Sequence, residues 1–193
     1  MLNKNEMQGF VLGLFEKKLN RFYHFHNAHH TLYVIDRATE IAQHEKCTLA
    51  EIELIKVAAL WHDTGYLNIY LGHEEESCAF VKKYLPDYGY CNEEIILVCG
   101  MIMATKTPQS PNNLLEEIVA DADLEYLGTS ASESTAMLLY KELKHLNPLL
   151  SLQQWNEIQI NFLKNHKYFT NFCKATAEPI KQAYLRKLID ELK

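Results

Sequence analysis

Residues that interrupt helices or cross-link a chain are scarce in this sequence. It contains seven glycines and five prolines among 193 residues, so long stretches can remain helical without a forced break. The five cysteines are odd in number, widely spaced and free of any C-x-x-C pair, which argues against a disulfide framework and a cysteine zinc site. No segment approaches the roughly 20 uninterrupted apolar residues of a transmembrane helix. We therefore expect a soluble protein with no membrane partner.

Concentrated positive charge is missing as well. The formal net charge is −6, which argues against binding to a nucleic acid polymer, because such binding requires a dense Lys and Arg surface. A small phosphorylated substrate needs only a metal ion and a few local cations, so it remains compatible with an acidic protein. The N-terminus lacks the basic and then apolar order of a secretory signal, and we expect a cytoplasmic location.

Apolar residues recur at helical spacing rather than in alternation, as in Val34, Ala38, Ile41 and Ala42. No repeat, low-complexity tract or composition shift marks a linker, and the length fits one domain. The sequence therefore predicts a single all-α domain over residues 1–193, with about eight or more helices. The expected helices are one that ends near residue 19 and others at about 30–44, 49–61, 74–85, 92–104, 114–125, 131–146, 152–166 and 178–192.

Local signals predict several helix ends. Thr48 and Glu51 form a capping box ahead of the third helix, and Gly65 is expected to mark the end of this helix. Asn92 is expected to cap the helix that follows it. Pro179 suits the first turn of the last helix, where its missing N–H costs nothing.

Histidine and aspartate are distributed unevenly along the chain. Four of the nine histidines lie within residues 23–31, and His62 is followed directly by Asp63. A second acidic group, Asp121 and Asp123, comes about 60 positions later. Neutral imidazole and carboxylate are the usual ligands of Zn, Mn, Fe and similar divalent ions. Adjacent helical residues point about 100° apart, so the His-Asp pair can address one ion only near a helix end.

The order His30, then His62-Asp63, then Asp123 resembles the H…HD…D signature of the HD superfamily of metal-dependent phosphohydrolases. In that family the signature goes with a helical fold and with a bound divalent metal ion. The resemblance is therefore a statement about both fold and metal chemistry, and it leaves the substrate open.

Segments around these residues are similar to the same family. Residues 25–34 resemble its Y-H-N-x-x-H-T-x-x-V motif, and residues 58–66 resemble its apolar helix into the HD pair. Residues 121–128 are similar to a D-A-D-L-x-x-L-G segment, and residues 73–79 to an N-E-x-x-S-A element, of a branch of predicted metal-dependent phosphohydrolases. Together these segments cover about residues 22–128.

The resemblance implies an HD-domain-like helical bundle, with a motif-bearing core at about residues 22–128 and a helical C-terminal extension at 129–193. It implies a metal-dependent phosphohydrolase, of the phosphatase or phosphodiesterase type, that acts on a nucleotide or another small phosphorylated metabolite. The implied cofactor is a divalent metal ion, drawn from Mn, Fe, Co, Ni, Zn and Mg.

Carried over position by position, the resemblance also implies a set of metal ligands. His26 and His29 are alternatives to His30 as a ligand, and Asp121 is an alternative to Asp123. Alignment of the family's A-D-L triplet with residues 122–124 favours Asp123. The implied metal ligands are His30, His62, Asp63 and Asp123.

Further side chains are candidates for catalysis or for substrate binding. Asp63 could orient a water molecule, since a liganding carboxylate can also accept a hydrogen bond, and the other catalytic candidates could act as general acid or base. The catalytic candidates are Asp63, Asp121, Glu74 and His73. The substrate-binding candidates are Lys106, Arg37 and His26.

Departures from the family pattern keep two alternatives open. Phe25 replaces a common tyrosine, His73 replaces an asparagine, and Tyr66 stands where some nucleotidases carry a helper glutamate. A di-iron oxygenase on the same scaffold would use additional histidines between the HD pair and the last aspartate, and His73 is the one present. A non-catalytic module that binds metal and nucleotide is the second alternative. A homodimer also stays open, because aromatic residues at 155, 162, 169 and 172 suit either core or dimer packing.

Overall fold

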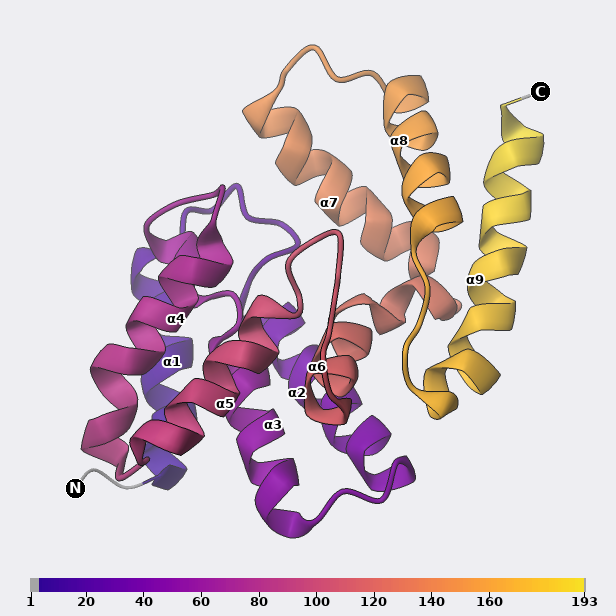
Figure 1. Ribbon diagram of the computed structural model, residues 1–193. Coiled ribbons are helices and arrows are strands. Elements are labelled where there is room, and N and C mark those ends of the chain that lie inside the picture. Colours follow the sequence, from indigo (N-terminus) through magenta and orange to yellow (C-terminus); the bar gives the residue numbers. More distant parts are fainter. Residues whose placement is uncertain (1–3, 193) are drawn as a thin grey trace.

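The computed structural model describes residues 4–192, and the regular secondary structure in that range is entirely helical (Figure 1). It contains nine α-helices and three short 3-10 helices, and no strand occurs among these residues, so the predicted all-α class is confirmed. None of the described helices combines the length and the hydrophobicity that crossing a membrane requires. The elements are α1 (Lys4–Lys18), α2 (Ala28–His44), α3 (Leu49–Trp61), η1 (Thr64–Leu67), α4 (His73–Tyr84), η2 (Leu85–Tyr88), α5 (Asn92–Met103), α6 (Leu114–Leu124), η3 (Glu125–Gly128), α7 (Ser132–Leu146), α8 (Leu152–Asn165) and α9 (Asn171–Glu191).

The helices of the described residues form two groups. Helix α2 packs against α3 and α6, and α4 and α5 pack beside α3, so that their apolar faces form one large core. Figure 1 shows α7, α8 and α9 gathered on the other side of the molecule. A smaller core, which includes Phe25, Leu124, Leu163 and Leu185, joins these C-terminal helices to the rest. The candidate site lies where the two groups meet.

Most helix starts follow their local sequence. The predicted capping box is present: Thr48 Oγ1 accepts the backbone N–H of Glu51, whose carboxylate accepts the N–H of Thr48. The expected cap at Asn92 is wrong by one position. Cys91 is the N-cap residue, and its N–H donates to Glu94 at 2.8 Å. The reciprocal bond to Glu94 determines where this helix begins.

Helix α9 begins earlier than its sequence predicts. Its N-cap is Thr170, whose hydroxyl accepts the backbone N–H of Cys173 at 3.2 Å. Pro179 therefore lies inside the helix rather than in its first turn. A proline at that position removes one hydrogen bond, to the carbonyl of Ala175, but packing on neighbouring elements holds the helix on both sides of it.

The sequence predicts that Gly65 ends a helix, but in the structure Gly65 has a different role. Helix α3 stops at Trp61, and Gly65 lies in η1, where a Cβ atom would overlap the backbone of His73. Its N–H donates to Ser77 Oγ at 2.8 Å, and this hydroxyl donates to the His62 carbonyl at 2.6 Å. The missing side chain thus lets the start of α4 lie directly against the His-Asp pair.

We expect Gly65→Ala to lower the free energy of unfolding by about 3 kcal/mol, because the added methyl group has to displace the backbone of His73. Urea denaturation followed by circular dichroism measures this change. Gly13→Ala, inside α1 where a Cβ atom would meet nothing within 4 Å, is the matched control and should stabilise the protein slightly. Equal stability of the two variants would show that no close approach exists at Gly65.

Candidate metal centre

Three helices bring the predicted metal ligands together. His30 lies in the first turn of α2, where the side chain of Asn27 accepts two backbone N–H groups and so fixes the start of the helix. His62 and Asp63 follow the end of α3, and Asp123 lies near the end of α6. Because α2 packs against both α3 and α6, side chains that are 93 positions apart in the chain meet.

The ligand atoms of these side chains converge on one small volume. His30 Nε2 lies 3.0 Å from Asp123 Oδ1 and 3.6 Å from Asp63 Oδ2. His62 Nε2 lies 3.2 Å from Asp63 Oδ2 and 3.5 Å from Asp123 Oδ1. One ligand atom from each of His30, His62 and Asp123 lies within 4.8 Å of the other two. A single divalent cation could bridge atoms with this spread.

Two atoms in this cluster are buried without a partner in hydrogen-bond geometry, namely His62 Nε2 and Asp63 Oδ2. Buried polar atoms are normally paired, so these two indicate a missing partner. His62 Nδ1–H donates to the Ala59 carbonyl at 2.8 Å, which leaves Nε2 as the atom that faces the cluster. Imidazole nitrogen and carboxylate oxygen are donors that divalent transition metals accept. The residues present therefore fit a divalent metal ion.

Electrostatics in the cluster favour positive charge. Burial disfavours a charged imidazole, but the carboxylates of Asp63 and Asp123 outweigh it and raise the pKa of His62 well above its ordinary value. Burial also disfavours charged carboxyl groups, yet His62 and His30 outweigh it and hold the pKa values of Asp63 and Asp123 well below their usual range. The field that attracts a proton to His62 Nε2 would equally attract a metal cation in its place.

His73 and Glu74 lie at the edge of the cluster. His73 Nε2 is 3.7 Å from Asp63 Oδ1, and its Nδ1–H donates to the Tyr70 carbonyl at 3.2 Å. The His73 ring stacks on Tyr66, with centroids 3.9 Å apart and planes inclined by 18°. Glu74 is buried, and its Oε2 lies 3.5 Å from His73 Nδ1. The structure thus brings His73 close to Asp63, with Glu74 beside His73.

His26 is held by a residue that sequence reasoning missed, the fully buried Glu142 of α7. Glu142 Oε1 lies 2.5 Å from His26 Nδ1, while Oε2 accepts the backbone N–H groups of Phe25 and His26 at 3.1 and 3.2 Å. His26 Nε2 then faces the Tyr66 hydroxyl at 3.3 Å. Burial lowers the pKa of His26, but the bond to Glu142 and the nearby carboxylates outweigh it, and the net pKa is raised.

A signal for Glu142 is present in the sequence. It lies three positions after Leu139 and one before Leu143, which line the apolar side of α7. A carboxylate on the apolar face of an amphipathic helix requires a buried partner. The sequence does not show which partner that is, because Glu142 and His26 are 116 positions apart.

Asp121 does not reach the site. Its carboxylate accepts the N–H of Phe169 at 2.9 Å and the N–H and hydroxyl of Thr170 at 2.8 and 2.7 Å, and burial raises its pKa to about 6. Two positions along a helix rotate a side chain by about 200°, so Asp121 and Asp123 point to opposite sides of α6. The prediction of a catalytic Asp121 is corrected: this residue anchors the segment ahead of α9.

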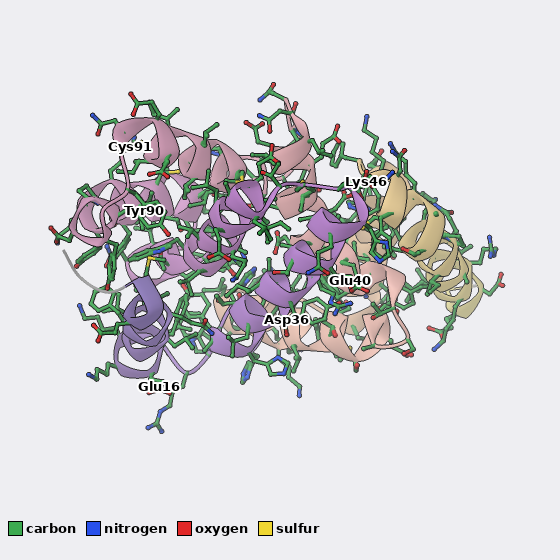
Figure 2. All side chains as sticks on the ribbon, turned by 90° about the horizontal axis from the view of Figure 1, so that it is seen from below. Glu16, Asp36, Glu40, Lys46, Tyr90 and Cys91 are labelled. Carbon is green, nitrogen blue, oxygen red and sulfur yellow. The ribbon has the colours of Figure 1, made fainter. Side chains whose placement is uncertain are left out.

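Arg37 also lies away from the site, two turns after His30 and about 10 Å further along the axis of α2. Its guanidinium pairs with Glu40 and lies over the Tyr33 ring, 6.0 Å from the centroid. Figure 2 shows Glu40 and the exposed Asp36 on the outward side of α2. The prediction of Arg37 as a substrate contact is corrected, because its guanidinium forms an ion pair with Glu40 on the outer surface of the molecule.

One cavity of about 420 Å³ connects the cluster with the C-terminal helices. The side chains at its polar end include His26, Asp63, His73, Glu74, Lys106 and Asp123. Lys106 therefore remains a candidate phosphate contact, although its ammonium pairs with the exposed Glu75. The opposite end is formed by apolar residues of α7 and α8.

Comparison with known proteins agrees with this architecture. The sequence profile of the HD domain matches residues 27–125. A predicted HD superfamily hydrolase from an uncultured Thermotogales bacterium, solved at 1.45 Å, has a similar structure with a TM-score of 0.65 and 18% sequence identity. The similarity covers 97% of this chain and 90% of that one. No curated protein matches the sequence. At this identity the structural likeness concerns the fold alone.

We expect His30→Ala to weaken Mn²⁺ binding by more than about 100-fold, because it removes a buried nitrogen that lies 3.0 Å from Asp123. Isothermal titration calorimetry with Mn²⁺ measures this loss. His29→Ala, which removes the exposed neighbouring imidazole, should leave the affinity unchanged. Similar losses in both variants would mean that the ion binds at the surface of this segment instead.

Proposed function

Because the chain belongs to the HD domain family, we propose that it is a metal-dependent phosphohydrolase that acts on a small phosphorylated molecule. The observation that carries the proposal is the convergence of His30, His62 and Asp123, with Asp63 beside both imidazoles and two buried atoms that lack partners, at a cavity that Asp63 and Asp123 line. Phosphate ester hydrolysis needs a cation at the phosphoryl oxygens, a positioned water molecule and a proton donor for the leaving oxygen. This chain has candidates for each requirement.

His30, His62, Asp63 and Asp123 would hold the ion. When bound, it supplies Lewis acid character and lowers the pKa of water. The protein fixes these residues beforehand: the Ala59 carbonyl orients the His62 ring, and Ser77 ties the His62 backbone to η1 and α4. Side chains locked in this way bind without a large ordering cost.

Orientation of the attacking water falls to Asp63 and its neighbours. Asp63 Oδ1 faces His73 Nε2 at 3.7 Å, a separation that leaves both groups available to a water molecule beside them. Glu74 lies behind His73 and can accept a proton from its ring. We assign Asp63 to positioning the water, and His73 with Glu74 to proton removal from the site.

Proton donation falls to His26. Glu142 binds Nδ1, so the imidazole presents Nε2 to the cavity side, where the Tyr66 hydroxyl lies at 3.3 Å. A buried carboxylate behind an imidazole fixes the ring orientation and stabilises its protonated form. His26 therefore acts as the general acid for the leaving oxygen, and Glu142 is its positioning residue.

The wild-type protein should hydrolyse phosphate esters when Mn²⁺, Co²⁺, Ni²⁺, Zn²⁺ or Mg²⁺ is added, and Asp63→Ala should lose both the metal and the activity. The reason is that Asp63 contacts both liganding imidazoles and faces the reaction volume. A substrate panel with phosphate release and metal analysis measures both properties. Full hydrolysis by Asp63→Ala would refute the assignment, and iron content with oxygen-dependent turnover would favour the oxygenase alternative.

Glu142→Gln should lower kcat by about 100-fold for alkyl phosphates and only a few-fold for p-nitrophenyl phosphate, because a good leaving group needs little protonation. His26→Gln should show the same pattern. Steady-state kinetics with both substrates separates this effect from a structural one, since a damaged fold would reduce both rates equally. Equal losses for the two substrates would exclude His26 as the general acid.

A further inference from the structure

The cavity continues from the cluster into a second part with different chemistry, which we name the apolar chamber. It is formed by facing sides of α7 and α8, which lie outside the segment 27–125 that matches the HD domain. Trp155 and Leu163 are almost fully buried, whereas Ile158 is 49% exposed and lies nearer the solvent. The side chains that define the apolar chamber are Leu139, Leu143, Trp155, Ile158, Phe162 and Leu163.

Polar groups in the apolar chamber are few, and most of them are paired or out of reach. Gln159 lines the same cavity, but its Oε1 accepts the Tyr184 hydroxyl at 2.9 Å and its Nε2 donates to Asn156 at 3.2 Å. The indole N–H of Trp155 has no partner, yet the nitrogen is itself buried rather than exposed to the cavity. A nucleobase or a sugar bound here would lose hydrogen bonds to water without replacing them.

Positive charge is also limited. Among the described residues that line the cavity, Lys106 is the single Lys or Arg, and it is paired with Glu75. The nearby Glu74 adds negative charge at the polar end. A chain of phosphates normally requires several Lys or Arg contacts beyond the metal ion. The cavity therefore suits one phosphoryl group, held at the cluster, rather than a polyphosphate.

The two parts form one continuous cavity, so a phosphoryl group near Asp63 and His73 leaves the rest of the molecule facing the C-terminal helices. On the basis of the proposed hydrolase function, we propose that the substrate is a phosphate monoester of an uncharged, apolar alcohol, and that the apolar chamber binds the alcohol part. Contacts with the metal cluster bind the phosphoryl group, while burial against Leu139, Ile158 and Phe162 selects for the alcohol.

Binding of n-alkylphosphonates to the Mn²⁺-loaded protein tests this proposal, because these stable analogues vary only in apolar length. Calorimetry should show that affinity rises about fourfold for each added methylene between methyl- and hexylphosphonate. Nucleoside mono- and triphosphates should bind more weakly than hexylphosphonate. Equal affinity across the alkyl series, or tighter binding of a nucleotide, would overturn the assignment.

Two isoleucines of similar exposure provide the matched variants. Ile158→Ser alters the apolar chamber, and Ile180→Ser alters the surface of α9, where the residue is 45% exposed and does not line the cavity. Ile158→Ser should weaken hexylphosphonate about tenfold without changing methylphosphonate, and Ile180→Ser should change neither. Equal effects of the two variants would overturn the proposal. Thermal melting confirms that both variants are folded.

Failure of this proposal and failure of the proposed function give different results. Metal-dependent hydrolysis of several esters with no dependence of binding on alkyl length would remove the apolar substrate class and leave the hydrolase intact. Length-dependent phosphonate binding without hydrolysis of any ester would support the apolar chamber and refute the hydrolase.

Discussion

Mutual compensation of buried charges is the constraint on which this structure depends. His62 and Asp63 are almost completely buried, and an isolated charge in such a place would cost many kcal/mol. The two stabilise each other at 3.2 Å, and α2 and α6 add His30 and Asp123 to the same volume. The apolar packing of these helices and the electrostatics of the cluster therefore both require the same arrangement of α2, α3 and α6. A shift of α2, α3 or α6 would both open the core and separate a charged group from its counterparts.

The two halves of the chain contribute different parts of the candidate site. Residues 27–125, which match the HD domain, contribute the whole ligand cluster. The C-terminal helices contribute no ligand, but they provide Glu142 behind His26 and the apolar wall of the cavity. Under the proposed function, the first half determines the kind of reaction, and the second half determines which substrates bind. Such a division lets substrate preference change while the cluster stays intact.

Features that depend on near neighbours could be predicted from the sequence, and those that depend on distant contacts could not. The capping box of Thr48 and Glu51 is local, and it is confirmed. The start of α9 was misplaced, because Thr170 is anchored by Asp121, 49 positions away. In the site, the resemblance of the histidines and aspartates to the H…HD…D signature implied the cluster. Helical phase alone could have separated Asp121 from Asp123, whereas the pairing of Glu142 with His26 required the tertiary structure.

The reach of Glu142 back to Phe25 and His26 also concerns how the molecule is made. These partners are 117 and 116 positions apart, so the beginning of the chain has long left the ribosome when α7 is synthesised. Every residue of the cluster is translated before Glu142. Under the proposed function, a nascent chain could therefore bind a metal ion while His26 is still unsupported, and catalytic competence would follow as a separate, later event of biosynthesis.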